Sequence, residues 1–151
     1  ETFCRSHQIH LIVVGPEEPL VKGVYDYFKA AHIANSFGEE WLGVIGPSAY
    51  AAQLEGSKAF AKEFMLRHGI PTASYKEFTV ETFEEGKHYV LNHALPIVLK
   101  ADGLAAGKGV IICHNHIEAI TEYEMMLQHS KFGEAGKKVV VEEFLTGIEL
   151  S

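Results

Sequence analysis

Apolar residues in the first third of the chain follow two different periods. Residues 9–14 and residues 43–45 form short apolar runs, each closed by a glycine and a proline, and both runs predict strands. Between them, Leu20, Val24, Tyr27 and Phe28 recur at helical spacing and predict a helix. Strand, helix and strand in this order are typical of an α/β fold.

The next predicted element is a helix bounded by Ser57 and Gly69. Ser57 is a candidate N-cap, Gly69 is a candidate stop, and Phe60 and Phe64 share one face between them. Lys58 falls in the first turn, where a cation opposes the helix dipole. A solvated lysine is the ordinary interpretation; the alternative is that Lys58 and the helix N-terminus face the same phosphate.

From residue 72 onward the pattern predicts strand, helix, strand, glycine loop, strand, helix and strand. Asn115 and Glu118 resemble a capping box at the start of the second helix. We expect the last strand to cover residues 138–144, with Glu142 and Glu143 as a solvated strand end unless they serve a ligand. The predicted buried stripe of the second helix consists of Ile117, Ile120, Tyr123 and Leu127.

The glycine loop carries the clearest chemical signal. An apolar strand at residues 97–99 fixes the base of Lys100, and Lys108 adds a second, mobile cation. Glycines permit positive φ and close backbone approach, so their N–H groups could bind phosphate oxygens. The pattern therefore indicates a polyphosphate site, with a plain glycine-rich hairpin as the alternative. The glycines are Gly103, Gly107 and Gly109.

This loop differs from a P-loop. Three residues rather than four separate Gly103 from Gly107, and Lys108 is followed by a glycine and an apolar strand instead of Ser or Thr and a helix. The loop is therefore expected to join two strands.

Composition narrows the function classes. The formal net charge of −7 argues against a nucleic-acid surface, and no apolar stretch is long enough to span a membrane. No secretory signal pattern is present, and Cys4 and Cys113 are expected to be two reduced thiols, which agrees with a cytoplasmic enzyme. His114 and His116 could share a metal ion, but no third ligand lies nearby, so no metal site is predicted within the chain.

Five segments, in order along nearly the whole chain, resemble the glycinamide ribonucleotide synthetases, also called phosphoribosylamine–glycine ligases. These are ATP-grasp enzymes of purine synthesis. The matching segments are residues 14–23 (VGPEEPLVKG), 53–58 (QLEGSK), 67–73 (RHGIPTA), 100–110 (KADGLAAGKGV) and 141–147 (VEEFLTG).

The resemblance implies an α/β fold in three parts. Residues 1–47 would be the second half of a Rossmann-like N-terminal domain, and residues 48–71 a helical connector. Residues 72–151 would be the small, lid-like nucleotide-binding subdomain of an ATP-grasp fold, incomplete at its C-terminus. Residues 34–42 look longer than the connection in many relatives, with Trp41 as a packing anchor. The chain is expected to be partial and inactive by itself.

The resemblance also implies a set of site residues. Lys58 and Lys100 would contact the phosphates of ATP, with Lys100 as the catalytic candidate, and Glu149 would accept hydrogen bonds from ribose hydroxyls. Gly15, Pro16 and Glu17 would border the phosphoribosylamine site. The remaining nucleotide contacts would be Asp102, Gly103, Gly107, Lys108 and Gly109 at the phosphates, and Glu142, Glu143, Phe144 and Leu145 at adenine.

The implied reaction joins glycine to 5-phosphoribosylamine through a glycyl phosphate, with ATP as phosphoryl donor. The Mg²⁺ or Mn²⁺ ligands are expected outside this chain. The expected partners are these small molecules, without nucleic acid or membrane. Two alternatives stay open: another ATP-grasp carboxylate–amine ligase, or a non-enzymatic α/β binding module.

Overall fold

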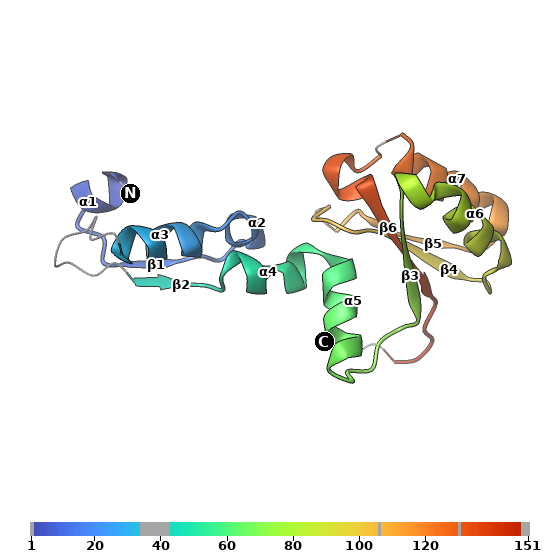
Figure 1. Ribbon diagram of the computed structural model, residues 1–151, viewed down its shortest axis with the longest axis horizontal. Helices are drawn as coiled ribbons and strands as arrows, with labels where there is room; N and C mark the ends of the chain where they lie inside the picture. The colour runs from blue at the N-terminus through green and yellow to red at the C-terminus, as the bar shows by residue number, and fades with distance from the viewer. Residues whose placement is uncertain (1, 34–42, 106, 130, 149–151) are drawn as a thin grey trace. The chain divides into compact units, whose positions relative to one another are not determined.

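The computed structural model describes residues 2–33, 43–105, 107–129 and 131–148 (Figure 1). The chain divides into two compact units, Glu1–Gly56 and Ser57–Ser151. The predicted loop at residues 34–42, with Trp41, lies outside the described residues.

The first unit is built around two short parallel strands. The strands pair in register from Leu11↔Gly43 to Val13↔Ile45, and a small core of Cys4 and Phe28 packs beside them. This confirms both predicted strands and the α/β pattern. The elements are α1 (Thr2–Ser6), β1 (Leu11–Val13), α2 (Glu17–Val21), α3 (Val24–Ile33), β2 (Gly43–Ile45) and α4 (Ala49–Gly56).

The single helix expected from Leu20, Val24 and Phe28 is in fact two helices. Lys22 is the C-cap of α2, and Gly23 follows with a φ of 85°, a left-handed conformation that glycine adopts without steric cost. Leu20 and Phe28 are buried but Tyr27 is 55% exposed, so the apolar spacing identified the buried side only in part, and the glycine decided where the helix breaks.

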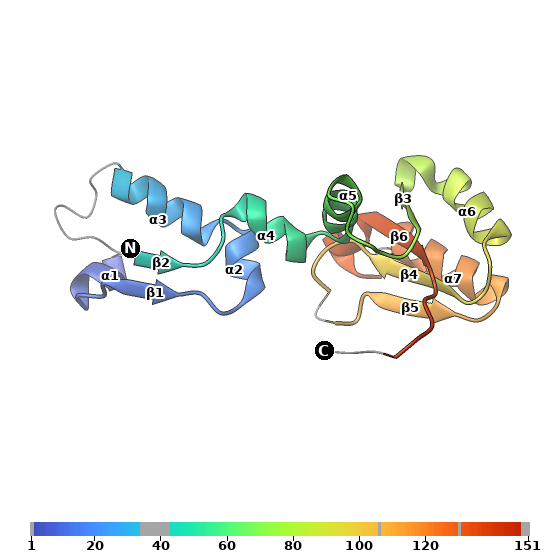
Figure 2. The same ribbon diagram turned by 90° about the horizontal axis from the view of Figure 1, so that it is seen from below.

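The second unit is a four-stranded sheet with two helices on one face (Figure 2). The sequence of elements from residue 72 onward is confirmed, and the last strand ends one residue earlier than predicted. The elements are α5 (Lys58–Arg67), β3 (Tyr75–Thr79), α6 (Phe83–Asn92), β4 (Ile97–Ala101), β5 (Val110–Cys113), α7 (His116–Leu127) and β6 (Lys138–Glu143), with short 3₁₀ turns at Val80–Thr82 and Gly133–Lys137.

The strand order is β3-β6-β4-β5, and every neighbouring pair is antiparallel. Strands β3 and β4 are therefore parallel but separated by β6, and β5 and β6 are parallel but separated by β4. Both strand–helix–strand units, β3-α6-β4 and β5-α7-β6, are therefore split βαβ units, in which one strand of the other unit lies between the two parallel strands. This order places β4 and β6 at the centre of the sheet.

The two central strands have two buried faces. Ile97 and Leu99 of β4, with Val139 and Val141 of β6, belong to the core formed with α6 and α7. Because side chains alternate along a strand, the residues between them point to the opposite face. That second face carries Val98, Lys100, Val140 and Glu142.

The start of α7 agrees with its predicted cap, but its buried stripe differs. The Asn115 side chain accepts a hydrogen bond from the Glu118 N–H at 2.9 Å, while Glu118 accepts from His114 rather than from the cap residue. Ile117 is 83% exposed, so its place in the predicted stripe was wrong. It precedes buried Ala119 by two residues, about 200° around the helix.

Among the described residues, no helix is both long enough and apolar enough to cross a membrane. Cys4 and Cys113 are buried free thiols, as expected.

Candidate functional site

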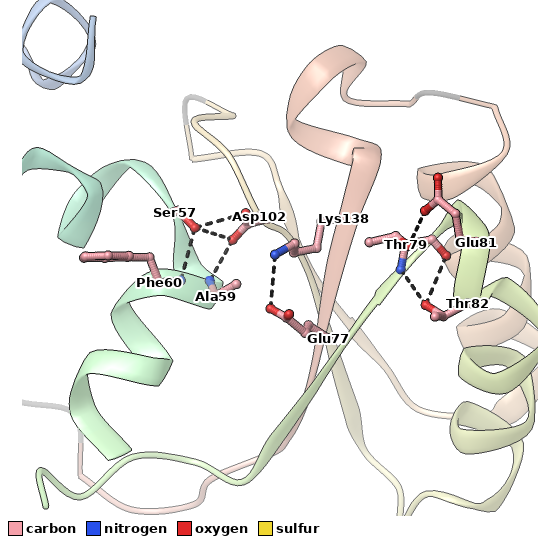
Figure 3. Close-up of polar contacts among 9 residues, drawn as sticks. All are labelled: Ser57, Ala59, Phe60, Glu77, Thr79, Glu81, Thr82, Asp102 and Lys138. Carbon is pink, nitrogen blue, oxygen red and sulfur yellow. Dashed lines mark hydrogen bonds and ion pairs between the residues drawn. The ribbon is translucent and has the colours of Figure 1, made fainter. Parts of the chain in front are cut away.

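Ser57 and Asp102 join the N-terminus of α5 to the end of β4 (Figure 3). Ser57 is the N-cap, and its Oγ accepts from the Phe60 N–H at 3.1 Å. The same hydroxyl lies 3.1 Å from both carboxylate oxygens of Asp102, and the Ala59 N–H donates to Asp102 Oδ1 at 2.7 Å. The Lys58 N–H donates to the Asp102 carbonyl at 3.1 Å.

Protein acceptors therefore already satisfy the first N–H groups of α5. The sequence suggested a phosphate at this helix N-terminus, but in the structure the Asp102 carboxylate supplies the negative charge there. A phosphate would have to displace Asp102 to reach those N–H groups. The contacts of Asp102 give it a structural role, and its contact with nucleotide stays a prediction.

The side chain of Lys58 extends along the glycine loop. Its Nζ donates to the Gly103 carbonyl at 3.1 Å and lies 3.4 Å from the Asp102 carbonyl. The first turn of α5 thus places a cation on the loop that the sequence identified as a phosphate site.

The loop is a hairpin between antiparallel β4 and β5, as its departure from a P-loop predicted. At two of its glycines, neighbouring atoms lie too close for a side chain. A Cβ on Gly109 would lie 2.7 Å from the Ala105 Cβ, and a Cβ on Gly103 would lie 3.0 Å from Ala135. Gly107 has a φ of 75°, the left-handed region.

Some of the backbone donors expected to bind phosphate are used inside the fold. The Lys108 N–H donates to the Ala105 carbonyl at 2.9 Å, and the Gly103 N–H lies 3.4 Å from the Ala135 carbonyl. The Lys108 side chain is exposed. Phosphate binding by this loop stays a prediction, and in this conformation it would depend on the lysines and the remaining N–H groups.

Lys100 lies on the second face of the sheet and is paired with an acid. Its Nζ is 2.9 Å from Glu142 Oε2, and a third residue, Lys62 of α5, places its Nζ 3.0 Å from the same oxygen. The Glu142 side chain is only 4% exposed, so the interpretation of residues 142–143 as a solvated strand end does not hold for Glu142.

Lys62 is the residue that the sequence analysis missed. Besides Glu142, its ammonium donates to Thr72 Oγ1 at 2.8 Å and to the Ala73 carbonyl at 3.1 Å. It also lies 5.6 Å from the centre of the Tyr75 ring, and burial together with nearby Glu77 raises the pKa of the Tyr75 hydroxyl. The available signal was position: Lys62 follows the buried Ala59 by three residues on the same face of α5.

Of the residues expected near adenine, Glu142 and Glu143 end β6, and Phe144 and Leu145 follow it. Glu143 accepts a hydrogen bond from the Ser74 N–H at 2.7 Å, which ties the strand end to the segment before β3. Phe144 and Leu145 are exposed apolar side chains. Glu149, the expected ribose contact, lies outside the described residues.

The expected phosphoribosylamine contacts lie in the first unit, where β1 leads into α2. Pro16 precedes the helix in extended conformation, Glu17 is its first residue, and Gly15, Pro16 and Glu17 are all exposed.

The described histidines do not form part of this site. His116 Nε2 bonds to the His93 carbonyl at 3.0 Å at the start of α7. Within the described ranges, no three His, Cys, Asp or Glu side chains gather where they could hold a metal ion.

An open cavity of about 760 Å³ lies beside β3 and α6, and Ser74 and Glu143 are among the residues that line it. Its lining includes Lys76, Glu85 and His88 but neither Lys58 nor Lys100. Lys76 and Glu85 form an ion pair at 2.7 Å, so they balance each other's charge there.

Two family models divide this chain between them. The model of the phosphoribosylglycinamide synthetase N domain matches residues 1–55, and the model of the ATP-grasp (A) domain of the same synthetase matches residues 56–151. The chain belongs to the phosphoribosylglycinamide synthetase family. The border between the two matches lies within one residue of the border between the compact units. The three-part division predicted from the sequence stays a prediction.

Curated relatives agree with the synthetase family. The chain is 52% identical over 149 residues to the phosphoribosylamine–glycine ligase of Yersinia pestis and 50% identical to that of Escherichia coli K12, with 99% of the chain aligned. It spans 32% of the length of each of these relatives.

Solved structures confirm the α/β, ATP-grasp fold class. The phosphoribosylamine–glycine ligase of Thermotoga maritima is 37% identical with a TM-score of 0.65, over 76% of this chain and 29% of that one. A biotin carboxylase domain from Hydrogenobacter thermophilus 2-oxoglutarate carboxylase, solved with MgADP and bicarbonate, is 25% identical with a TM-score of 0.67, over 95% and 30% of the two chains.

Proposed function

We propose that this chain provides phosphate and adenine contacts for an ATP-dependent phosphoribosylamine–glycine ligase. Membership of the synthetase family supports the reaction. The observation that carries the proposal is the position of Lys58, which donates to the glycine loop, together with that of Lys100 near the end of the strand that leads into this loop. Two cations set on rigid elements suit a polyphosphate ligand.

In the proposed reaction, a glycine carboxylate oxygen attacks the γ-phosphorus of ATP, giving glycyl phosphate and ADP. The phosphoribosylamine nitrogen then attacks the glycyl carbonyl carbon, the carbon–oxygen bond to phosphate breaks, and the amine proton is lost. No protein nucleophile is needed, so the residues act by positioning and by neutralising charge. Lys58 and Lys100 would hold the phosphates.

A divalent metal is expected with ATP in this family, but the carboxylates near the loop do not fit one. Asp102 accepts from Ser57 and Ala59, and Glu142 is paired with two lysines. With no suitable acidic cluster among the described residues, the proposal assigns no step of the reaction to a metal bound by them.

The test is Lys100→Met in a full-length protein that contains these 151 residues, with ATP binding followed by calorimetry. Loss of one charge-assisted hydrogen bond of about 1.5 to 3 kcal/mol should weaken ATP binding by roughly tenfold to a hundredfold. Lys87→Met is the matched control, because Lys87 pairs with Glu124 between the helices on the other face of the sheet. Unchanged ATP affinity in Lys100→Met would refute the proposed role.

The choice of substrate is tested separately. Phosphate release by the full-length protein should require both glycine and phosphoribosylamine. Release with another carboxylate or amine, and none with this pair, would favour the alternative of a different ATP-grasp ligase.

A further inference from the structure

We propose that Lys62 is a positioning residue for Lys100, and that by sharing the Glu142 carboxylate it keeps the positive charge of Lys100 available to nucleotide phosphates. The inference rests on the proposed function, and it concerns a residue that makes no contact with nucleotide itself.

The three side chains form one charge cluster on the second face of the sheet. Glu142 Oε2 accepts a hydrogen bond from Lys100 at 2.9 Å and forms an ion pair with Lys62 at 3.0 Å. Its other oxygen, Oε1, is buried and has no hydrogen-bond partner among the described residues. One carboxylate thus faces two ammonium groups, and with all three ionised the cluster carries a net charge of +1.

The two lysines differ in how much of their bonding capacity is used. An ammonium group has three N–H donors, and Lys62 uses two of them in hydrogen bonds to Thr72 and Ala73 while its charge pairs with Glu142 at 3.0 Å. Among the described residues, the only hydrogen bond found for the Lys100 ammonium is to Glu142. The Lys62 side chain is 7% exposed and that of Lys100 is 27% exposed. Lys62 is therefore fixed in the fold, whereas Lys100 has donors left for a ligand.

The consequence for Lys100 is electrostatic. Without Lys62, Lys100 and Glu142 would form a neutral pair, and the buried carboxylate would oppose any phosphate approaching Lys100. With Lys62 present, its positive charge neutralises the Glu142 carboxylate, and the positive charge of Lys100 is left uncompensated. The low exposure of Glu142 strengthens this effect, because water screens buried charges poorly.

The first experiment compares ATP with adenosine, which has the same base and sugar but no phosphates. In the full-length protein, Lys62→Met should weaken ATP binding about tenfold, equal to about 1.4 kcal/mol, and leave adenosine binding within about twofold. A residue that merely stabilised the fold would weaken both ligands alike. Equal losses, or no loss, would overturn the proposal.

Two controls separate charge from structure. Lys87→Met removes one positive charge on the helix-covered face and should leave the ATP-to-adenosine ratio unchanged. Thr72→Val removes one hydrogen-bond partner of Lys62 without changing any charge, so it should lower the melting temperature but not the ratio. A ratio lowered as far by Thr72→Val as by Lys62→Met would show that Lys62 acts through structure alone.

A compensating variant tests the charge balance directly. Lys62→Met with Glu142→Gln restores the net charge of +1, so the ATP-to-adenosine ratio should recover. If Lys62→Met does not fold, Glu142→Gln alone carries the test and should raise the ratio, since both lysines lose their counter-charge. An unchanged ratio in Glu142→Gln would overturn the proposal. Wild-type protein that binds no ATP would instead contradict the proposed function.

Discussion

Asp102 offers the sharpest test of how the fold holds the candidate phosphate site. Its carboxylate accepts from the Ser57 hydroxyl at 3.1 Å and from the Ala59 N–H at 2.7 Å, and its carbonyl accepts from the Lys58 N–H. The substitution Asp102→Asn keeps the shape of the side chain and removes its charge. The amide oxygen can still accept from Ala59, but the amide nitrogen cannot accept from Ser57.

The expected cost follows from these contacts. Replacing an ionised acceptor by a neutral one forfeits part of a charge-assisted bond of about 1.5 to 3 kcal/mol. Removing a negative charge from the N-terminus of a helix costs about 0.3 to 1 kcal/mol more. The site is only partly buried, so we expect a total loss of about 2 kcal/mol in the free energy of unfolding. In a unit of this size that is a fall of roughly 8–16 °C in melting temperature.

Urea unfolding measures the global loss, and amide hydrogen exchange locates it. Protection should fall at the N–H groups of residues 58–60, since these donate to Asp102 and Ser57. Glu81→Gln is a control in the same unit, because Glu81 is an exposed acid whose carboxylate accepts a local bond from Thr79 (Figure 3). Wild-type stability and unchanged exchange at residues 58–60 in Asp102→Asn would refute this account of the junction.

Three further predictions concern other parts of the chain. In Gly86→Ala the new Cβ would lie 1.8 Å from the Tyr123 hydroxyl oxygen. An overpacking cost of about 3 kcal/mol should exceed the gain of about 1 kcal/mol in helix propensity, so the variant should be less stable than wild type. A urea midpoint at or above that of wild type would contradict this. Burial raises the pKa of the Cys113 thiol from 9.0 to about 11, so its stabilising contribution should be complete below pH 9 and lost between pH 9 and 11. Iodoacetamide at pH 8 should label Cys113 only after unfolding, and rapid labelling of the native chain, mapped by mass spectrometry, would refute its burial. The family resemblance predicts that Glu149 contacts the ribose of ATP. Glu149→Gln should therefore reduce the difference in KM between ATP and either 2′-deoxy-ATP or 3′-deoxy-ATP, and unchanged KM ratios would refute this contact.

The sequence predicted the elements whose determinants are local. Ser57 and Asn115 cap their helices where a polar residue precedes an apolar period, because capping needs only the next three residues. The order of strands and helices after residue 72 followed from their periods. Errors arose at single residues: Gly23 divides a helix, and Ile117 continues an apolar spacing on an exposed face of α7.

The candidate site was predicted in part. Lys58 was singled out in the first turn of a predicted helix and Lys100 at the end of a strand before a glycine loop. In the structure Lys58 lies at that loop and Lys100 on the second face of the sheet, and their contact with phosphate stays a prediction. The use of the α5 N-terminus by Asp102 was not foreseen, because residues 57 and 102 are 45 positions apart and only the tertiary fold brings them together. A helix N-terminus predicts an anion, and the sequence could not tell a carboxylate of the protein from a phosphate of a ligand.

Glu142 shows what a closer reading of alternation could have found. Residues 139–141 are three consecutive valines, a pattern that predicts a central strand buried on both faces. Glu142 comes directly after these valines and two residues after Val140, so its side chain points to the same face as Val140. In a strand that is buried on both faces, that side chain must be buried. A buried carboxylate needs a cation and hydrogen bonds, so the sequence of this strand predicts a basic partner for Glu142. Which lysine would supply it depended on how α5 packs against the sheet. In the structure two lysines pair with Glu142, Lys100 and Lys62. In our proposal, the pairing of Lys62 with Glu142 keeps the positive charge of Lys100 available to a ligand.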